Sequence, residues 1–276
     1  MFETVHYYLQ SKKIKSPVTF VMLADLHNHS YGENNQILLE EIDRHSPDFV
    51  CIAGDMLIGN TKVPYDVAQQ IVIALAEKYQ VFYGLGNHEA RMKHDVAIYD
   101  PLYDQYMEPI IAKGVCVLAN ESIQCRVGEN DLYIYGYDLP MKYFEKFNRY
   151  PFEISQIEEV FGKGEEFANC FRILLAHNPV YFRQYAGWGA DLTLSGHLHG
   201  GIIRLPLLGG VITPQAKLFP RYCSGKYTLD EKYMIVSRGL GTHTIPIRFN
   251  NKPELSVIHL EPIKTTEKWK NNGITS

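Results

Sequence analysis

Five short apolar runs divide this chain of 276 residues, and each run leads into residues that can bind a metal ion or take part in catalysis. The runs cover residues 18–24, 48–53, 81–85, 171–176 and 190–195. Each has the near-continuous apolar composition of a strand buried on both faces. Helical patterns at residues 34–45 and 67–79 follow the first two runs. Strands that alternate with helices favour an open parallel sheet, which typically binds ligands beyond the carboxyl ends of its strands.

The last run leads into Gly196-His197-Leu198-His199-Gly200. The glycines allow a sharp turn and a close approach of the backbone to an ion. The two imidazoles supply neutral nitrogen donors that suit Zn, Mn, Fe or Co. The alternative is a turn with two ordinary histidines, so the interpretation as a metal site depends on the other loops.

The other four loops carry the same kinds of side chain. In chain order they contain Asp25-Leu26-His27, Gly54-Asp55, Gly86-Asn87-His88-Glu89 and His177-Asn178. A carboxylate and an imidazole two residues apart can converge on one ion, and an Asn carbonyl can also bind a metal. Each loop has a simpler interpretation: Asp25 could cap a helix, and a lone histidine such as His177 is usually a hydrogen-bonded structural residue.

Composition narrows the class of protein. The chain is 46% hydrophobic, which is enough for a substantial core, and we expect a single domain over residues 1–276. Lys and Arg number 27 against 31 for Asp and Glu, so no global basic field would recruit nucleic acid. The odd number of cysteines, five, without a C-x-x-C pair, argues against a disulfide framework and favours a reducing compartment.

The first 16 residues contain charged side chains and no apolar run. We therefore expect neither a signal peptide nor a transmembrane segment, and predict a cytoplasmic protein, membrane-associated only if an anchor precedes these residues.

The rest of the chain is predicted to form one helix and several strands. Residues 95–113 look helical although Pro101 and Pro109 interrupt the pattern, and residues 115–118 look like a strand. Residues 122–127 and 132–137 could form a hairpin, and residues 233–237, 244–249 and 254–260 have β-like composition without intervening helices.

The order D-x-H, G-D, G-N-H-E, H and G-H-x-H resembles the calcineurin-like metallophosphoesterase superfamily. The matching residues are Asp25 and His27, Gly54 and Asp55, Gly86 to Glu89, His177, and Gly196, His197 and His199. Further along, Gly200-Gly201, Arg204-Leu205-Pro206, residues 237–241 and Pro246-Ile247-Arg248-Phe249 resemble the bacterial YkuE/YaeI-type phosphodiesterase branch. The motif core covers about residues 18–250.

The resemblance implies a different fold from the open sheet that the strand pattern predicts. It implies an α/β four-layer αββα sandwich, in which two mixed β-sheets are flanked by helices. The β-like segments after residue 230 fit a second sheet.

The resemblance also implies two divalent metal ions. One ion would be bound by Asp25, His27, Asp55 and His199, and the other by Asp55, Asn87, His177 and His197, with Asp55 as the bridge. Mn is our first choice, and Zn, Fe and Co suit the same ligands. A metal-bridging hydroxide would attack phosphorus. His88 is the implied catalytic residue, which would contact the phosphate or assist the leaving oxygen, and Glu89 could orient it.

The function implied is that of a dinuclear metal-dependent phosphoesterase, which hydrolyses phosphodiesters. The alternatives are a nuclease, a pyrophosphohydrolase acting on UDP-sugars or lipids, and a non-catalytic metal-binding scaffold. Scaffolds of this kind usually lose ligands or the catalytic histidine, and this chain retains both. The expected partner is a small phosphoester, and an amphiphilic one is compatible with the sequence. The sequence leaves the natural substrate and the oligomeric state open.

Several other segments carry side chains that could serve the site. Residues 141–150 are aromatic and basic, and form either a substrate rim or, as the simpler interpretation, a partly exposed amphipathic segment. Residues 202–212 are apolar, and form either a lid or lipid-facing lip, or a loop packed over the edge of the sandwich. Arg204 and Arg221 could contact phosphate.

The remaining histidines are assigned lesser roles. His29 and His94 fit surface or supporting positions near the motifs, and His243 lies in a glycine-rich loop that could approach the site. His6, His45 and His259 have no partner spacing and are taken as structural.

Overall fold

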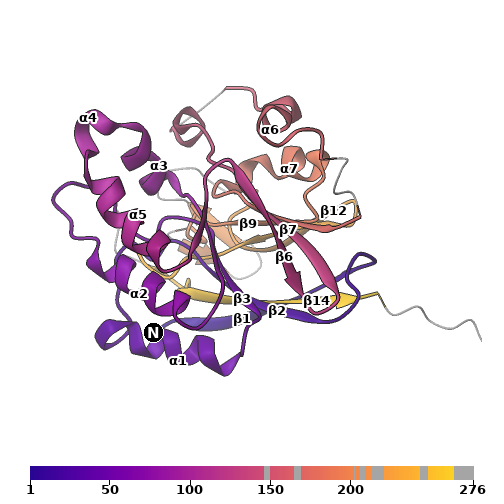
Figure 1. The fold of residues 1–276 in the computed structure, drawn as a ribbon, viewed down its shortest axis with the longest axis horizontal. Helices are drawn as coiled ribbons and strands as arrows, with labels where there is room; N and C mark the ends of the chain where they lie inside the picture. Colours follow the sequence, from indigo (N-terminus) through magenta and orange to yellow (C-terminus); the bar gives the residue numbers. More distant parts are fainter. Residues whose placement is uncertain are drawn as a thin grey trace, which may run out of the picture.

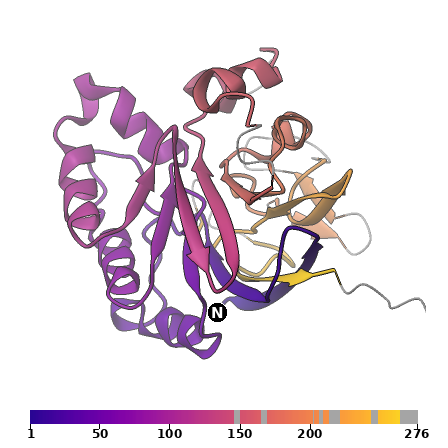
Figure 2. The same cartoon turned by 45° about the vertical axis from the view of Figure 1, so that its right-hand side comes forward.

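Two mixed sheets pack face to face, and helices cover the outer face of each (Figures 1 and 2). The computed structural model describes residues 1–145, 150–164, 169–201, 203–205, 209–212, 221–242 and 248–263. Within these ranges each sheet has six strands, in the orders β1-β14-β2-β3-β4-β5 and β12-β13-β9-β8-β7-β6. The predicted four-layer αββα sandwich is therefore confirmed.

The strands of the first sheet are β1 (Glu3–Ser11), β14 (Glu254–Pro262), β2 (Val18–Leu23), β3 (Phe49–Ile52), β4 (Val81–Gly84) and β5 (Cys116–Leu118). Those of the second are β12 (Gly225–Leu229), β13 (Lys232–Val236), β9 (Leu192–Ser195), β8 (Phe171–Leu175), β7 (Asn130–Gly136) and β6 (Glu121–Val127). Strands β10 (Ile203–Leu205) and β11 (Gly209–Ile212) form a separate antiparallel pair.

The α-helices are α1 (Gln36–Arg44), α2 (Asp66–Ala76), α3 (Asn87–His94), α4 (Val96–Tyr99), α5 (Leu102–Ala112), α6 (Ile154–Phe161) and α7 (Phe182–Trp188). Short 3₁₀ turns are η1 (Glu33–Asn35), η2 (Met141–Phe144) and η4 (Pro179–Tyr181). None of the helices in the described ranges combines the length and the apolar character needed to cross a membrane.

The central core is built from side chains that point to opposite faces of each strand in alternation. In β2, Phe20 and Met22 point towards the second sheet, whereas Val21 and Leu23 point towards the helices on the other side. Phe49 of β3 stacks on Phe20 with ring centroids 4.6 Å apart. Because both faces of these strands are buried, their sequences are apolar throughout, which explains why the runs were recognisable in the sequence.

Helices on the two outer faces complete the layers. Helices α1, α2 and α5, which are purple in Figure 1, pack on the first sheet through apolar side chains such as Ile42, Val72 and Ile110. Helices α6 and α7 pack on the second sheet, where Ile157 and Trp188 join its core. Each helix therefore buries one apolar face against a sheet.

Strand direction brings the loops of interest to one end of the sandwich. Strands β2, β3, β4 and β5 are parallel to one another, and so are β7, β8, β9 and β13 in the second sheet. The loops that follow β3 and β8 touch, because Nδ1 of His177 lies 2.6 Å from the carbonyl oxygen of Ala53. The carboxyl ends of strands from both sheets therefore meet.

Some elements differ from the sequence-based predictions. The elements that were not predicted are strand β1, helices α3, α6 and α7, and strands β10, β11 and β12. β1 is long but partly polar, and the others are short. The helix expected over residues 95–113 is divided into α4 and α5 at Pro101, whereas Pro109 lies inside α5. The predicted hairpin is confirmed by the antiparallel pair β6 and β7. The strand predicted at residues 244–249 lies mostly outside the described residues.

The inner core predicts a large cost for losing one aromatic ring. Phe49 is fully buried between the sheets, so Phe49→Ala should lower the free energy of unfolding by about 3–5 kcal/mol. Chemical denaturation measures this loss. Ile37→Ala on α1 is the control, because Ile37 is 57% exposed and its loss should cost less than about 0.5 kcal/mol. Equal losses for the two variants would contradict this packing.

Candidate metal centre

Backbone hydrogen bonds join the loops at the carboxyl end of the sandwich. The amide of Asp25 donates to the carbonyl of Gly54 over 3.0 Å, and that of His27 donates to the carbonyl of Asp55 over 3.2 Å. The amide of His197 donates to the Asp25 carboxylate, at 3.1 and 3.0 Å from its two oxygens. The loops after β2, β3 and β9 are thereby held as one unit.

Five of the predicted ligands have left-handed backbone conformations. They are Asp25 (φ 50°), His27 (φ 47°), Asp55 (φ 55°), His197 (φ 72°) and His199 (φ 50°). Asp and His enter this region more readily than most residues, and such conformations cluster at functional sites, where the surrounding structure maintains them.

The first group of donor atoms comes from Asp25, His27 and His199, whose ligand atoms lie within 4.8 Å of one another. The Nε2 atoms of His27 and His199 are 3.2 Å apart. Nε2 of His199 lies 3.5 Å, and Nε2 of His27 3.9 Å, from Oδ1 of Asp25. This spacing matches the first predicted set of ligands, with Asp55 as the fourth member.

The second group contains Asp55, His177 and His197, again with ligand atoms within 4.8 Å of one another. Nε2 of His177 lies 3.1 Å from Oδ2 of Asp55. Oδ2 of Asp55 is also 3.9 Å from Nε2 of His27, so one oxygen faces both groups. This is the position that a bridging carboxylate requires.

Asn87 provides a test of whether these residues fit metal ions. Its Oδ1 atom is buried and has no hydrogen-bond partner among the described residues. A buried amide oxygen without a partner is costly, and metal ligation would satisfy it. Nitrogen and oxygen donors together suit divalent Mn, Fe, Zn or Co. The residues present therefore fit divalent metal ions.

Backbone carbonyls face the Nδ1 atoms of two of the imidazoles, on the side of each ring away from the centre. Nδ1 of His177 faces the carbonyl of Ala53 at 2.6 Å, and Nδ1 of His27 faces that of Leu57 at 3.3 Å. When Nδ1 donates its proton to a carbonyl, Nε2 keeps a lone pair for a metal. This arrangement directs Nε2 of both rings into the centre.

The charges of the centre are strongly coupled. Burial raises the pKa of Asp25 to about 7, although His177 opposes the change. Burial lowers the pKa of His177, but Asp55 and Asp25 outweigh it and raise that pKa to about 10. Burial lowers the pKa of His199 well below its ordinary value. Without metal, the carboxylates depend on protons on His177 for compensation, and cations at the same place would replace those protons.

Gly86 allows the loops after β3 and β4 to touch. A Cβ atom at this position would lie 2.2 Å from Oδ1 and 2.4 Å from the backbone nitrogen of Asp55. No side chain fits there, which gives a physical reason for glycine before Asn87.

Glu89 has a different role from the one expected. Its carboxylate accepts hydrogen bonds from the amides of Asp55 (2.9 Å), Met56 (2.9 Å) and Gly86 (3.0 Å), and from the hydroxyl of Tyr83 (2.9 Å). The expectation that Glu89 orients His88 was wrong. Glu89 instead ties the Asp55 loop to the start of α3.

His88 lies beside the shared carboxylate and is held in one tautomer. Its Nδ1 atom accepts a hydrogen bond of 2.9 Å from the amide of Gly59. Since an amide only donates, Nδ1 must be the acceptor, and Nε2 carries the proton of the neutral ring. Nε2 lies 3.9 Å from Oδ2 of Asp55. The ring thus presents an N–H group to the centre.

Gly59 and Tyr99 support His88 and were missed in the sequence. A Cβ atom on Gly59 would lie 2.8 Å from the carbonyl oxygen of His88, so the loop approaches α3 as closely as a backbone can. The hydroxyl of Tyr99 donates to the carbonyl of Gly59 over 3.1 Å. The glycine four residues after Asp55 was the only local signal, and nothing in the sequence connected Tyr99 to it.

The other segments named from the sequence have mixed outcomes. The ring centroid of Phe144 lies 5.0 Å from that of His197, so this part of the segment 141–150 borders the metal centre. Residues 146–149 lie outside the described ranges. His29 packs on Tyr31, and Nε2 of His94 lies 2.8 Å from Oδ2 of Asp138. These two histidines are thus engaged away from the ligands.

The remaining predictions concern His243, the segment 202–212 with Arg204, and Arg221. His243 lies outside the described residues, as do the side chains of residues 202–220, which include Arg204 and the predicted lid. Arg221 stacks over the ring of Tyr222 at 5.4 Å.

A C-terminal segment supports the His199 loop. The side-chain amide of Asn251 donates to the carbonyls of His199 and Gly201, over 2.6 Å each. Arg248 donates to the carbonyl of Arg238 over 2.7 Å. The segment around Arg248 was noted in the sequence only by resemblance, and its contacts show that it braces the loops after β9 and β13.

The sandwich fold and its clusters of histidine and aspartate donors define the class of metallophosphoesterases. The model of the calcineurin-like phosphoesterase family matches residues 18–201, which is most of the chain. The chain belongs to this family.

Curated relatives cover nearly the whole chain. It is 27% identical over 278 residues to the metallophosphoesterase YkuE of Bacillus subtilis (strain 168), covering 95% of this chain and 86% of YkuE. It is 25% identical over 267 residues to the phosphodiesterase YaeI of Escherichia coli (strain K12), covering 94% of this chain and 88% of YaeI. The resemblance to the YkuE/YaeI-type branch is confirmed.

A solved structure shares the fold. A putative 5′-nucleotidase from Staphylococcus aureus superposes with a TM-score of 0.51 at 12% identity, over 91% of this chain and 55% of that chain. At this level of identity the likeness concerns the fold alone.

The contacts of Glu89 predict an effect on the metal ligands rather than on His88. Glu89→Gln replaces one acceptor oxygen with a donor that faces backbone amides, so it should lower the free energy of unfolding by about 1–3 kcal/mol and weaken metal binding. Denaturation and metal titration measure the two effects, with Glu40→Gln on the surface as control. If Glu89→Gln lowered turnover but left stability and metal affinity unchanged, Glu89 would instead have the role of orienting His88.

Proposed function

We propose that this protein is a dinuclear metal-dependent phosphodiesterase. The observation that carries the proposal is the position of Asp55, whose Oδ2 atom faces donor groups on both sides and lies beside His88. The name of its relative YaeI, a phosphodiesterase, supports the choice of diesters over monoesters.

The two sets of ligands are those that the family resemblance implies. The donor group of Asp25, His27 and His199 and that of Asp55, His177 and His197 support them, and a third group joins His27, Asp55 and His88. Asp25, His27, Asp55 and His199 would hold one ion, and Asp55, Asn87, His177 and His197 would hold the other. Two divalent ions about 3.5–4 Å apart would bind phosphoryl oxygens and supply a nucleophile near neutral pH. The mixed imidazole and carboxylate donors suit Mn, Fe, Zn and Co alike, and Mn is the first ion to test.

His88 would complete the reaction at the substrate. Its Nε2–H group points to the place beside Asp55 where a phosphoryl group would lie, so it can donate a hydrogen bond to a phosphoryl or leaving oxygen. The amide of Gly59 occupies Nδ1 and fixes the direction of the ring. His88 therefore acts as a positioned donor whose geometry is set before substrate binds.

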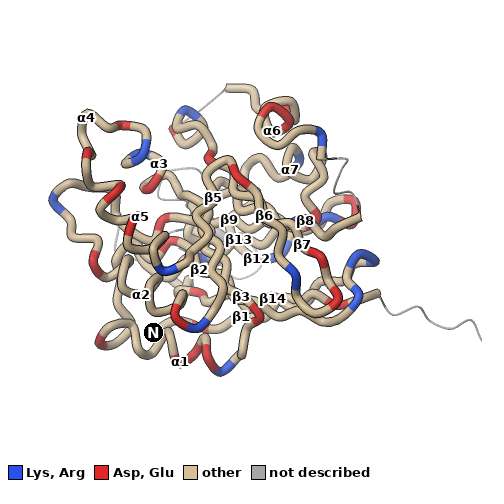
Figure 3. Tube along the Cα trace, in the orientation of Figure 1, with Lys and Arg blue, Asp and Glu red and all other residues tan. Residues whose placement is uncertain are grey.

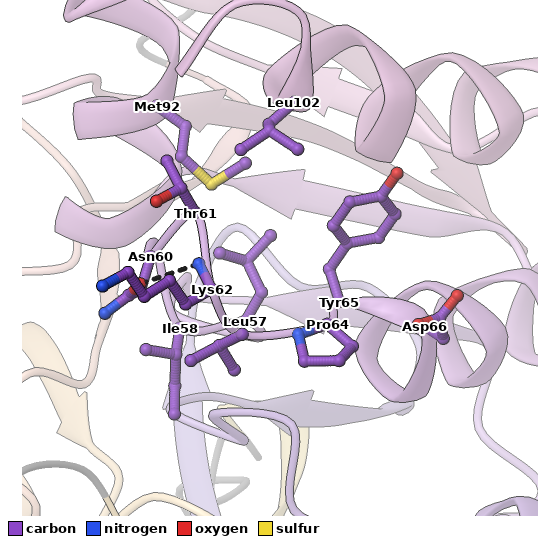
Figure 4. Close-up of a pocket in the computed structure, with 11 residues that line it drawn as sticks. Leu57, Ile58, Asn60, Thr61, Lys62, Pro64, Tyr65, Asp66, Met92 and Leu102 are labelled. Atoms are coloured by element: carbon purple, nitrogen blue, oxygen red, sulfur yellow. Dashed lines mark hydrogen bonds between the residues drawn. The ribbon is translucent and has the colours of Figure 1, made fainter. Parts of the chain in front are cut away.

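A pocket beside the loop after Asp55 supports an organic leaving group. The pocket, about 320 Å³ in volume, lies between the loop after Asp55 and helices α3 and α5 (Figure 4). Its lining includes the apolar side chains of Leu57, Ile58, Met92 and Leu102, with Lys62 among its polar residues. The same loop holds the His88 ring through Gly59. An amphiphilic phosphoester with an apolar group would suit this lining, in which Lys62 and Asp66 are the charged side chains.

Charge and cysteine chemistry bear on the alternatives. Basic and acidic residues are interspersed along the trace in Figure 3, an arrangement that favours a small phosphoester over a nucleic acid.

All five cysteines are free thiols, which supports a reducing, cytoplasmic setting.

Metal-dependent turnover of synthetic esters tests the function. Protein stripped of metal and reloaded with Mn²⁺ should hydrolyse bis-(p-nitrophenyl) phosphate faster than p-nitrophenyl phosphate. Asp55→Asn should lose both metal and turnover, because one carboxylate serves two ions. His88→Ala should keep the metal and lose turnover by about 10²- to 10⁴-fold.

His29→Ala is a matched control, since this exposed histidine packs on Tyr31 near the same loop. A protein that binds two ions per chain but hydrolyses neither ester nor any organic diester of a broad panel would contradict the proposal. Loss of metal in His88→Ala would show that His88 is a ligand.

The support of His88 by Gly59 gives a further prediction. Tyr99→Phe removes the hydroxyl that holds the Gly59 carbonyl, a bond that contributes about 0.5–1.5 kcal/mol, so kcat should fall by about 2- to 10-fold. Metal content should stay unchanged, as measured by elemental analysis. Tyr79→Phe, which removes a hydroxyl that donates to Asp43 outside the pocket, is the control. Unchanged kcat in Tyr99→Phe would show that the loop needs no such support.

A further inference from the structure

Three histidines far from the metal centre gather on one exposed face. His6 lies on edge strand β1, His259 on the neighbouring strand β14, and His45 directly after helix α1. The parallel register pairs Tyr8 with His259 and places His6 two residues earlier on the same outward face. These residues have no regular spacing in the sequence, so only the strand pairing brings them together.

The nitrogen atoms of two of these rings have the separation of ligands on one metal. Nδ1 of His6 lies 3.0 Å from Nε2 of His259. Two nitrogens bound to one tetrahedral Zn²⁺ at about 2.0–2.1 Å are about 3.3 Å apart. In the candidate metal centre, the corresponding distance between His27 and His199 is 3.2 Å.

Neighbouring side chains hold His259 in the direction that a ligand needs. The hydroxyl of Thr19, which lies opposite His259 in the β2–β14 pair, is 3.1 Å from Nδ1 of His259. Tyr8 stacks on the same ring, with centroids 4.6 Å apart. A hydroxyl on Nδ1 and an aromatic ring against the face are the kind of support that fixes a metal-binding imidazole.

Further donors lie at the edge of the pair. The ring of His45 is 5.1 Å from that of His6, and Nε2 of His45 is 3.3 Å from Oε1 of Glu41. The hydroxyl of Thr4 also donates to Oε1 of Glu41, over 2.7 Å. These contacts hold His45 and Glu41 beside the pair, but no three donor atoms of the four residues lie within 4.8 Å of one another, so the pair alone has the spacing of ligands.

We propose that His6 and His259 form a two-imidazole surface site for a divalent transition metal ion of the Zn²⁺ or Cu²⁺ type. Imidazole nitrogens suit these ions, and the exposed position leaves room for water to complete the coordination. An ion bound there connects edge strand β1 to β14. Because it binds the folded chain, it stabilises this edge of the first sheet.

The number of Zn²⁺ ions bound per chain tests the proposal. The full chain is dialysed against buffered Zn²⁺, and bound metal is measured by elemental analysis. Wild-type protein should hold one ion more than His6→Gln or His259→Gln. The control is His94→Gln, an exposed histidine paired with Asp138, which should bind as wild type does.

Thermal unfolding provides a second readout that does not depend on the catalytic centre. Without added metal, His6→Gln, His259→Gln and wild type should unfold at similar temperatures, and Zn²⁺ should raise the Tm of wild type more than that of either variant. Diester turnover should be the same in all three. Equal Zn²⁺ counts and equal Tm shifts would overturn the proposal and leave His6 and His259 as a hydrogen-bonded pair. Both tests compare wild type with the His6 and His259 variants in Zn²⁺ count and in Tm, and neither uses turnover. Failure of the proposed phosphodiesterase activity would therefore not affect the result.

Discussion

The structure of the site depends on a single buried carboxylate. Burial of Asp55 opposes its ionisation, but the neighbouring His177 and His88 hold its pKa well below its ordinary value. Its Oδ1 atom accepts the amide of His88 over 2.8 Å, whereas Oδ2 faces the imidazoles of both donor groups. An ionised group in this position needs cations around it, and the whole end of the sandwich is arranged to supply them.

The backbone around Asp55 is held by contacts that do not involve a metal. Glu89 binds the amides of Asp55 and Gly86, and its partner Tyr83 lies 3.0 Å from the hydroxyl of Tyr106 on α5. The outer helical layer is thereby connected to the ligands through buried hydrogen bonds. Because fully satisfied buried networks are rigid, the ligands can be positioned before an ion binds.

Much of the site was predictable because its signals are local. Buried parallel strands are apolar throughout, and Asp25, Asp55 and His177 stand directly after such runs, so order along the chain was enough to place them at one edge. The second sheet was different. Its existence followed from the resemblance to a family, since strand patterns alone predicted one open sheet and gave no way to divide the strands between two.

The residues that sequence reasoning missed act through contacts between distant segments. Gly59 matters because His88 approaches its backbone, and Tyr99 matters because its hydroxyl reaches Gly59 from another helix. Glu89 was assigned to its neighbour in sequence, whereas its carboxylate points to another loop. His6 and His259 are 253 residues apart and meet only through the register of β1 and β14. Such pairs carry no periodic signal.

The most direct test of the account is a crystal structure of the Mn²⁺-loaded protein with anomalous diffraction data. The account predicts two anomalous peaks about 3.5–4 Å apart, with one Asp55 oxygen between them and the Asn87 side-chain oxygen on the ion nearer His177. A single peak, or two peaks that do not share Asp55, would contradict it.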